Sequence, residues 1–61
     1  MHEKLKMLRI AANLTQEEAA KRLGVCQTAI SMWESGNSKP RINMIKKIAE
    51  VYDCNVEQLF K

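Results

Sequence analysis

The sequence contains few of the residues that hold very small proteins together through crosslinks or metal ions. Its 61 residues include two cysteines, Cys26 and Cys54, and a single histidine, His2. Two cysteines can form one disulfide at most, and these three residues show neither the CxxC nor the HxxxH spacing of metal sites. Because a structural zinc ion usually takes four ligands, we expect no metal site and two free thiols.

Long apolar runs are also missing. The first ten residues, MHEKLKMLRI, carry charges throughout and lack the apolar segment of a secretory signal peptide. No stretch approaches the ~20 apolar residues that a membrane-spanning helix needs. We therefore expect no membrane partner. We also expect a cytoplasmic protein, because the cytoplasm keeps cysteines reduced.

Groups that perform catalysis are equally scarce. The one histidine lies near the end of the chain, and the sequence has no paired catalytic carboxylates, nucleophile motif or glycine-rich phosphate loop. The neighbouring Glu17 and Glu18 are better explained by their place at the start of a helix. The sequence therefore predicts that the chain is not an enzyme, and we expect neither a cofactor nor a small-molecule ligand.

Apolar residues make up 46% of the chain, but they include only one Trp, one Tyr and one Phe. The core is therefore mainly aliphatic, and it is small, because a chain of about 60 residues buries only about 60% of its surface. Residues 1–61 fit one domain at most. The net charge of +3 favours an anionic partner such as nucleic acid, although simple solubility explains it equally well.

Apolar residues recur at helical spacing along the chain, and no alternation typical of strands is present. Asn13, Gly24, Gly36 and the Asp53-Cys54 pair interrupt this pattern, and Asn and Gly readily end helices in the left-handed conformation. The sequence predicts an all-α protein with five short helices at about residues 2–12, 15–23, 26–35, 41–52 and 55–60. The strongest apolar stripe lies in the fourth helix and is expected to face the core: Ile42, Ile45, Ile48, Ala49 and Tyr52.

The second helix has a well-defined start, whereas the third does not. Thr15 can accept a hydrogen bond from the backbone N–H of Glu18, whose side chain can bond back to the N–H of Thr15. Leu14 precedes this capping box and is expected to face Ala19. Cys26 stands at the N-cap of the third helix, although a thiol accepts hydrogen bonds weakly. We expect a small buried thiol there, and a redox-sensitive cysteine at the positive helix end is the alternative.

Residues 16–35 combine the features that two helices joined by a tight turn require. Ala20 is small where the helices cross, and Gly24 supplies the positive φ of the turn. Apolar side chains close the wedge between the helices: Leu23, Val25, Ile30 and Trp33. An almost uncharged outer face remains on the third helix and suits the floor of a DNA groove: Cys26, Gln27, Thr28, Ser31, Met32 and Ser35.

The run LTQEEAAKRLGVCQTAISMWESGNSKP resembles the helix-turn-helix of the Xre family, which includes the lambdoid phage repressors and Cro proteins. Many positions of the family motif agree at once: Gln16, Ala20, Gly24, Val25, Ile30, Trp33, Glu34 and Gly36. The resemblance extends over nearly the whole chain. It implies a compact bundle of five helices around a central helix-turn-helix, as in lambda-repressor-like DNA-binding domains.

The resemblance also implies roles for individual residues. Base edges in the major groove would be contacted by Gln27, Thr28, Ser31 and Met32. Among these, Gln27 can form two hydrogen bonds with adenine. DNA phosphates would be contacted by Arg9, Gln16, Asn37, Lys39 and Arg41. Arg9 and Glu34 match a paired Arg and Glu known from some phage repressors of the family.

Xre-type domains commonly bind near-palindromic operators, which implies a homodimer with its recognition helices one turn of DNA, about 34 Å, apart. The dimer contact would use Val56, Leu59 and Phe60, or else Leu59 and Phe60 only complete the core. We thus expect a transcriptional regulator, and specifically a repressor, that binds double-stranded DNA and associates with the nucleoid when bound. The alternative is a protein-interaction module or antitoxin-like partner on the same fold.

Overall fold

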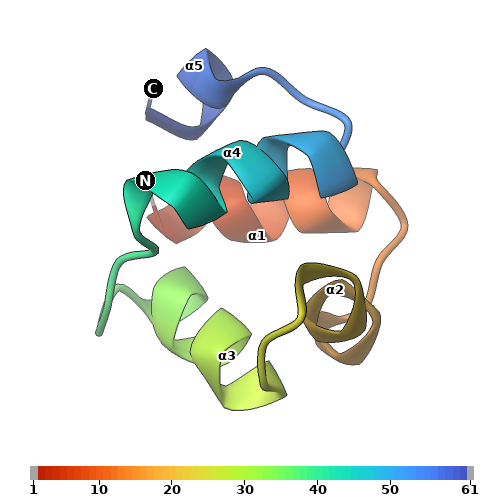
Figure 1. Cartoon of the computed structure of the whole chain (residues 1–61), viewed down its shortest axis with the longest axis vertical. Helices are drawn as coiled ribbons and strands as arrows, with labels where there is room; N and C mark the ends of the chain where they lie inside the picture. Colours follow the sequence, from red (N-terminus) through yellow and green to blue (C-terminus); the bar gives the residue numbers. More distant parts are fainter. Residues whose placement is uncertain (1, 61) are drawn as a thin grey trace.

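Five short helices follow one another in the computed structural model, which describes residues 2–60 and the side chains of residues 2–59 (Figure 1). The described residues contain no strand, and the helices are α1 (His2–Ala11), α2 (Gln16–Leu23), α3 (Gln27–Ser35), α4 (Ile42–Val51) and α5 (Val56–Phe60). The prediction of an all-α protein with five helices is therefore confirmed. Each observed helix end lies within one residue of its expected position. The differences arise because cap residues have non-helical backbone angles.

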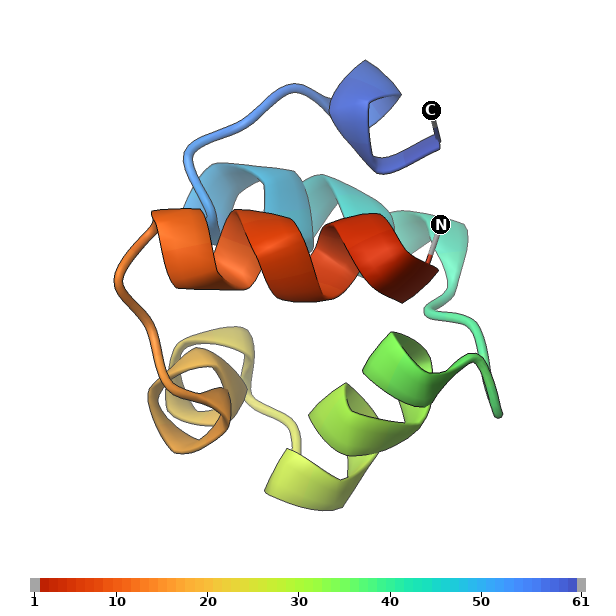
Figure 2. The same ribbon diagram turned by 180° about the vertical axis from the view of Figure 1, so that it is seen from behind.

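The helices form three levels along the molecule. In both Figure 1 and Figure 2, α5 lies at one end, α2 and α3 lie at the other, and α1 and α4 lie between them. Helix α3 packs against both α1 and α2, whereas α4 packs against α2 and α5. Helix α3 is therefore held by two neighbours at the end of the molecule opposite α5.

A single apolar cluster draws residues from all five helices: Leu5, Leu14, Ala19, Ala20, Leu23, Ile30, Ile45, Ile48, Ala49, Tyr52 and Leu59. The largest fully buried side chains come from four different helices and are Leu23, Ile30, Ile48 and Leu59. Burying a side chain of this size contributes about 1.5–3 kcal/mol. These contacts join α2, α3, α4 and α5 in one core, so α3 is rigidly connected to the rest of the protein.

Ile42 departs from the predicted stripe of α4. The other residues expected to face the core, Ile45, Ile48, Ala49 and Tyr52, are buried, but Ile42 is 60% exposed. The expectation for Ile42 is wrong because this residue lies in the first turn of α4, ahead of the residues that pack in the core. Helical periodicity shows which face is apolar, but it does not show where the neighbouring helices end.

Helix α2 begins with the capping box that the sequence predicts. The backbone N–H of Glu18 donates to Oγ1 of Thr15 at 3.1 Å, and the backbone N–H of Thr15 donates to Oε1 of Glu18 at 3.1 Å. These hydrogen bonds, first the one from the Thr15 backbone, lower the pKa of Glu18 below its ordinary value of 4.5. The carboxylate form of Glu18 is therefore the form that stabilises the start of α2.

We expect this capping box to make stability depend on pH in the acid range. Because folding lowers the pKa of Glu18, its contribution is present above pH 4.5 and is lost as the pH falls through the folded pKa. The variant Glu18→Gln keeps a side chain that can accept the same hydrogen bond but cannot ionise. Urea unfolding of both proteins between neutral and acid pH should show a wild-type advantage at neutral pH that disappears below pH 4.5. A difference that stays constant over this range would contradict the assignment.

Candidate nucleic-acid interface

The turn between α2 and α3 sets the angle at which α3 leaves the body of the protein. Gly24 has φ 72° and ψ 31°, a left-handed conformation that a side chain would strain. The backbone N–H of Val25 donates to the carbonyl oxygen of Ala20 at 3.0 Å, which closes the turn. Ala20 and Ile30 are both buried where the helices meet. The helix-turn-helix predicted from the sequence is therefore present in the fold.

The outer face of α3 brings together the residues expected to contact bases. Gln27, Thr28, Ser31 and Met32 are all exposed, and their spacing places them on one side of a helix. Met32, the only large apolar side chain among them, is 40% exposed. The face is therefore narrow, uncharged and rich in groups that can donate and accept hydrogen bonds.

Arg9 and Glu34 form a nearly buried ion pair between α1 and α3. The guanidinium donates through Nε to Oε2 of Glu34 at 2.6 Å and through Nη2 to Oε1 at 3.2 Å. It also donates through Nη1 to the carbonyl oxygen of Leu14 at 2.7 Å. The side chains of Arg9 and Glu34 are only 10% and 6% exposed. Arg9 thus offers little surface to a phosphate, and its contacts instead fix the end of α1 against α3.

Two glutamines connect the ion pair to the outer face of α3 through hydrogen bonds. Gln16 donates through Nε2 to Oε1 of Glu34 at 3.1 Å, and Gln27 donates through Nε2 to Oε1 of Gln16 at 3.4 Å. A line of hydrogen bonds therefore connects buried Arg9 with exposed Gln27. The family resemblance implied the pairing of Arg9 with Glu34, but the sequence gave no sign of the two glutamine contacts, which join residues far apart in the chain.

Tyr52 lies in the core close to this ion pair. Burial raises the pKa of Tyr52 to about 12, and the negative charge of Glu34 adds to the effect. The phenol therefore stays uncharged at neutral pH.

The segment after α3 presents the other polar residues that the resemblance assigns to phosphates. The backbone N–H groups of Asn37 and Ser38 both donate to the carbonyl oxygen of Met32, at 3.0 and 3.3 Å. Asn37, Lys39 and Arg41 are exposed, and within residues 2–59 their side chains form no hydrogen bond or ion pair. Two free cations and an amide therefore lie in the segment that connects α3 to α4.

Cys26 is exposed, so the expectation that it is a small buried thiol is wrong. Its backbone has the extended conformation of an N-cap, with φ −81° and ψ 155°, but its side chain forms no capping hydrogen bond. The N-cap position at the end of a protruding helix explains the exposure. Cys54, by contrast, is partly buried, and this burial raises the pKa of its thiol. Both cysteines are free.

The missing cap of α3 gives a prediction for stability. The variant Cys26→Ser should raise the free energy of unfolding by about 1 kcal/mol, because a hydroxyl can accept from the first free N–H groups of α3. The matched control is Thr15→Ala, which removes the acceptor that caps α2 and should lower stability by a similar amount. Urea unfolding measures both. If Thr15→Ala is destabilised but Cys26→Ser is no more stable than the wild type, the thiol already satisfies the helix end.

The residues expected to form a dimer contact on α5 have unequal positions. Leu59 is completely buried, so its side chain completes the core and leaves no surface for a partner. Val56 is partly buried against the same core. The side chain of Phe60 lies outside the described residues. Helix α5 therefore presents little apolar surface of its own through Val56 and Leu59.

Other kinds of site find no support among the described residues. Residues 2–60 contain no group of three or more His, Cys, Asp or Glu side chains that could hold a metal ion. In the same range, none of the helices has the length and apolar character needed to cross a membrane.

Comparisons with known proteins match nearly the whole chain. The model of the helix-turn-helix family matches residues 5–59. The chain is 43% identical over 58 residues to the HTH-type transcriptional activator BcrR of Enterococcus faecalis, an alignment that covers 95% of the chain and 28% of that protein. It is 40% identical over 60 residues to an uncharacterized HTH-type transcriptional regulator of Methanocaldococcus jannaschii, covering 98% of the chain and 91% of that protein.

A phage protein extends this similarity. The cryptic phage CTXphi transcriptional repressor RstR of Vibrio cholerae is 30% identical over 56 residues, covering 92% of the chain and 50% of that protein. The chain thus spans about a quarter of BcrR and half of RstR, but nearly all of the archaeal regulator. Together with the observed helix-turn-helix, the match over residues 5–59 shows that the chain belongs to the Xre-like helix-turn-helix family of DNA-binding transcriptional regulators, which is not a family of enzymes.

Proposed function

We propose that the protein is a transcriptional repressor that binds a near-palindromic operator in double-stranded DNA as a homodimer. The observation that carries this proposal is the outer face of α3, which is exposed, uncharged and held at one end of the molecule. An α-helix fits the major groove of B-DNA, where each base pair presents a distinct pattern of donors and acceptors. Helix α3 is therefore the recognition helix of the proposal.

Four side chains of α3 would contact base edges. Gln27 can form two hydrogen bonds with N6 and N7 of adenine, and its bond to Gln16 orients it before DNA arrives. Thr28 and Ser31 supply hydroxyl groups, and the methyl group of Thr28 can also meet a thymine methyl. Met32 has no donor, so it can only give apolar contact, for which the thymine methyl group is suited.

Phosphate contacts would fix the position of α3 in the groove. Asn37, Lys39 and Arg41 lie beyond the C-terminal end of α3, while Gln16 lies at the start of α2. Contacts of this kind set register and orientation without reading sequence. Arg9 was expected to join them, but in this proposal it acts mainly through Glu34 and Gln16, because its guanidinium is nearly buried.

Repression is the simplest regulatory outcome of such binding. A protein that occupies an operator overlapping a promoter excludes polymerase by its presence alone, whereas an activator needs an additional surface that contacts polymerase. The named repressor RstR supports this choice, although the relative BcrR is named as an activator. Because its proposed partner is operator DNA, the protein would act in the cytoplasm, on the nucleoid.

A protein-interaction module is the second candidate function. Such a surface should be more apolar and aromatic than the rest of the protein. On the outer face of α3 only Met32 is large and apolar. The composition of this face therefore favours DNA over a protein as its partner.

Selection of binding sites from a random duplex DNA library tests the proposal. We expect enrichment of two inverted half-sites about one helical turn, ~34 Å, apart. A reporter gene whose promoter overlaps the selected site should then lose expression when the protein is present. If no sequence is enriched and salt abolishes the residual binding, the contact is non-specific and the interaction module becomes the better assignment. Increased reporter expression would contradict repression while leaving operator binding intact.

A further inference from the structure

A residue of α1 covers the end of helix α3. His2 is the first residue of α1, and its imidazole lies against Gly36, the left-handed residue that ends α3. A Cβ atom at position 36 would lie 3.2 Å from Nδ1 of His2 and 3.4 Å from its Cγ, so the ring occupies the space that a side chain would need. His2 therefore lies beside the segment that connects α3 to α4.

The imidazole forms one wall of a pocket between α1 and this segment, with a volume of about 240 Å³. The side chains that line the pocket are the apolar Leu5, Trp33 and Pro40 and the polar His2, Ser38 and Lys39. Leu5 and Pro40 are buried, whereas His2 and Lys39 are exposed. A ligand that enters from solvent would therefore meet the polar side chains first.

The three polar side chains can all donate hydrogen bonds to an anion. Within residues 2–59, the hydroxyl of Ser38 and the ammonium of Lys39 take part in no hydrogen bond or ion pair. The side chain of His2 is 50% exposed, and its Nε2 lies 4.0 Å from Oε1 of Glu3. Phosphate oxygens accept hydrogen bonds from hydroxyl, ammonium and imidazole groups. The donors of the pocket therefore suit a phosphate group.

The place of the pocket in the fold indicates which phosphate it can meet. In both Figure 1 and Figure 2, the start of α1 lies beside the end of α3. Lys39 lines the pocket and is also one of the exposed residues proposed to contact the DNA backbone. A helix in the major groove has a sugar–phosphate strand on either side. The pocket therefore lies where the end of α3 would approach one of these strands.

We propose that His2 and Ser38, together with Lys39, bind one phosphate of the DNA backbone beside the bases that α3 contacts. The inference rests on the proposed function only in that α3 must lie in the groove of double-stranded DNA. It does not depend on which bases are read, on repression or on dimer formation, because a phosphate contact carries no sequence information. His2 makes the start of α1 part of the DNA contact.

An imidazole in this pocket makes DNA binding depend on pH. Histidine side chains gain a positive charge as the pH falls from about 8 to about 5. His2 is the only histidine of the chain. The charged groups that face it are Glu3 on α1 and Lys39 on the segment after α3, and the other residues of the pocket are uncharged. We therefore expect the affinity for DNA to be higher at about pH 6 than at about pH 8.

Titration of a labelled duplex of random sequence, followed by fluorescence anisotropy at these two pH values, tests the contact. At the lower pH, His2→Gln should weaken binding by on the order of three- to tenfold and reduce the dependence of log affinity on log salt by about one unit. At the higher pH the difference from the wild type should shrink. Ser38→Ala should weaken binding at both pH values and keep the pH dependence. Glu3→Gln should strengthen binding, because it removes a carboxylate 4.0 Å from Nε2 of His2 that repels phosphate.

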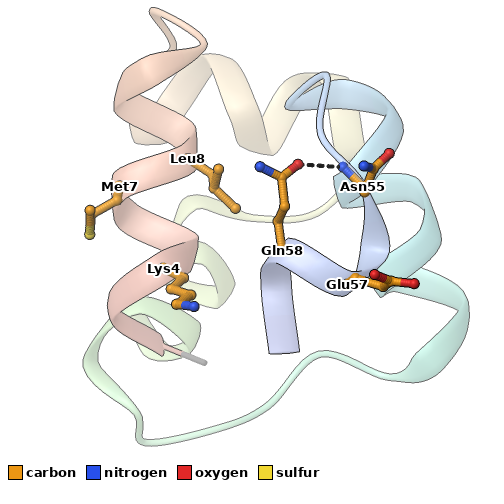
Figure 3. A pocket seen from close by; sticks show the side chains of 6 residues that line it. All are labelled: Lys4, Met7, Leu8, Asn55, Glu57 and Gln58. Atoms are coloured by element: carbon orange, nitrogen blue, oxygen red, sulfur yellow. Dashed lines mark hydrogen bonds between the residues drawn. The ribbon is translucent and has the colours of Figure 1, made fainter. Parts of the chain in front are cut away.

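The matched control is Lys4→Gln, which removes a charge from the same helix at a different surface. Lys4 lines a separate groove between α1 and α5 (Figure 3), so this variant should keep the pH dependence of the wild type. Circular dichroism checks that every variant is folded.

The outcomes separate this inference from the proposed function. A His2→Gln variant with the affinity and pH dependence of the wild type would overturn the phosphate pocket, even where a preferred operator is still selected. An equal loss for Lys4→Gln and His2→Gln at both pH values would overturn it as well, because general charge then explains the binding. If site selection enriches no sequence but His2→Gln still weakens binding to the random duplex, the proposed function fails and the phosphate pocket stands.

Discussion

Replacement of Arg9 by alanine is expected to lower the free energy of unfolding by about 3–5 kcal/mol. The substitution leaves the carboxylate of Glu34, whose side chain is 6% exposed, without its cation, and it also removes the donor to the carbonyl oxygen of Leu14. Small proteins have a total stability of about 5–15 kcal/mol, so this loss would leave the fold marginal. Urea unfolding at neutral pH, followed by circular dichroism, measures the change.

Two further variants distinguish the effect of burying the Arg9–Glu34 pair from the effect of losing any charged side chain. Lys21→Ala breaks an exposed pair with Glu17 at 3.6 Å and should cost less than about 1 kcal/mol. The double variant Arg9→Met, Glu34→Leu removes both charges, and it should recover much of the loss because no unpaired charge remains buried. A loss below about 1 kcal/mol for Arg9→Ala would mean that water or a rearranged side chain compensates Glu34.

The parts of the fold that the sequence predicted well depend on neighbours in the chain. Asn13, Gly24 and Gly36 all have positive φ, as their residue types and positions indicated. The capping box of Thr15 and Glu18 is likewise a contact over three residues. Such features follow from backbone sterics and local hydrogen bonds, which depend on residues close together in the sequence.

The errors concern residues whose environment is set by distant segments. Ile42 has the correct helical spacing, yet the core ends before the first turn of α4. Cys26 is exposed rather than buried, because its position at the N-cap outweighs the tendency of free cysteines to lie in the interior. Burial depends on which helices pack nearby, and periodicity within one helix does not contain that information.

In the candidate site, too, the contacts between residues far apart in the chain were the harder ones to predict. The outer face of α3 was predicted from spacing alone, and the Arg9–Glu34 pair from the family resemblance. The contacts of Gln16 with Glu34 and Gln27 were missed, because they join residues 18 and 11 positions apart. They form only once the turn at Gly24 has set the angle between α2 and α3. These contacts connect the stability of the ion pair to the side chain proposed to contact bases.

Replacement of Gln27 by alanine is expected to weaken binding to the selected operator by about 1–3 kcal/mol per half-site and to relax sequence preference at one position of each. The loss arises because alanine cannot form the paired hydrogen bonds that distinguish adenine from the other bases. Titration of DNA carrying the selected site, and repetition of the site selection with the variant, measure affinity and preference.

Two control variants distinguish base recognition by Gln27 from non-specific attraction to DNA and from the orientation of the Gln27 side chain. Lys39→Ala should weaken binding to all sequences alike and reduce the dependence of log affinity on log salt by about one unit per half-site. Gln16→Ala removes both a proposed phosphate contact and the hydrogen-bond partner of Gln27, so it should reduce affinity while keeping the preferred base at the Gln27 position. If Gln27→Ala keeps every sequence preference of the wild type, Gln27 does not contact bases. The specificity of α3 then depends on Thr28, Ser31 and Met32.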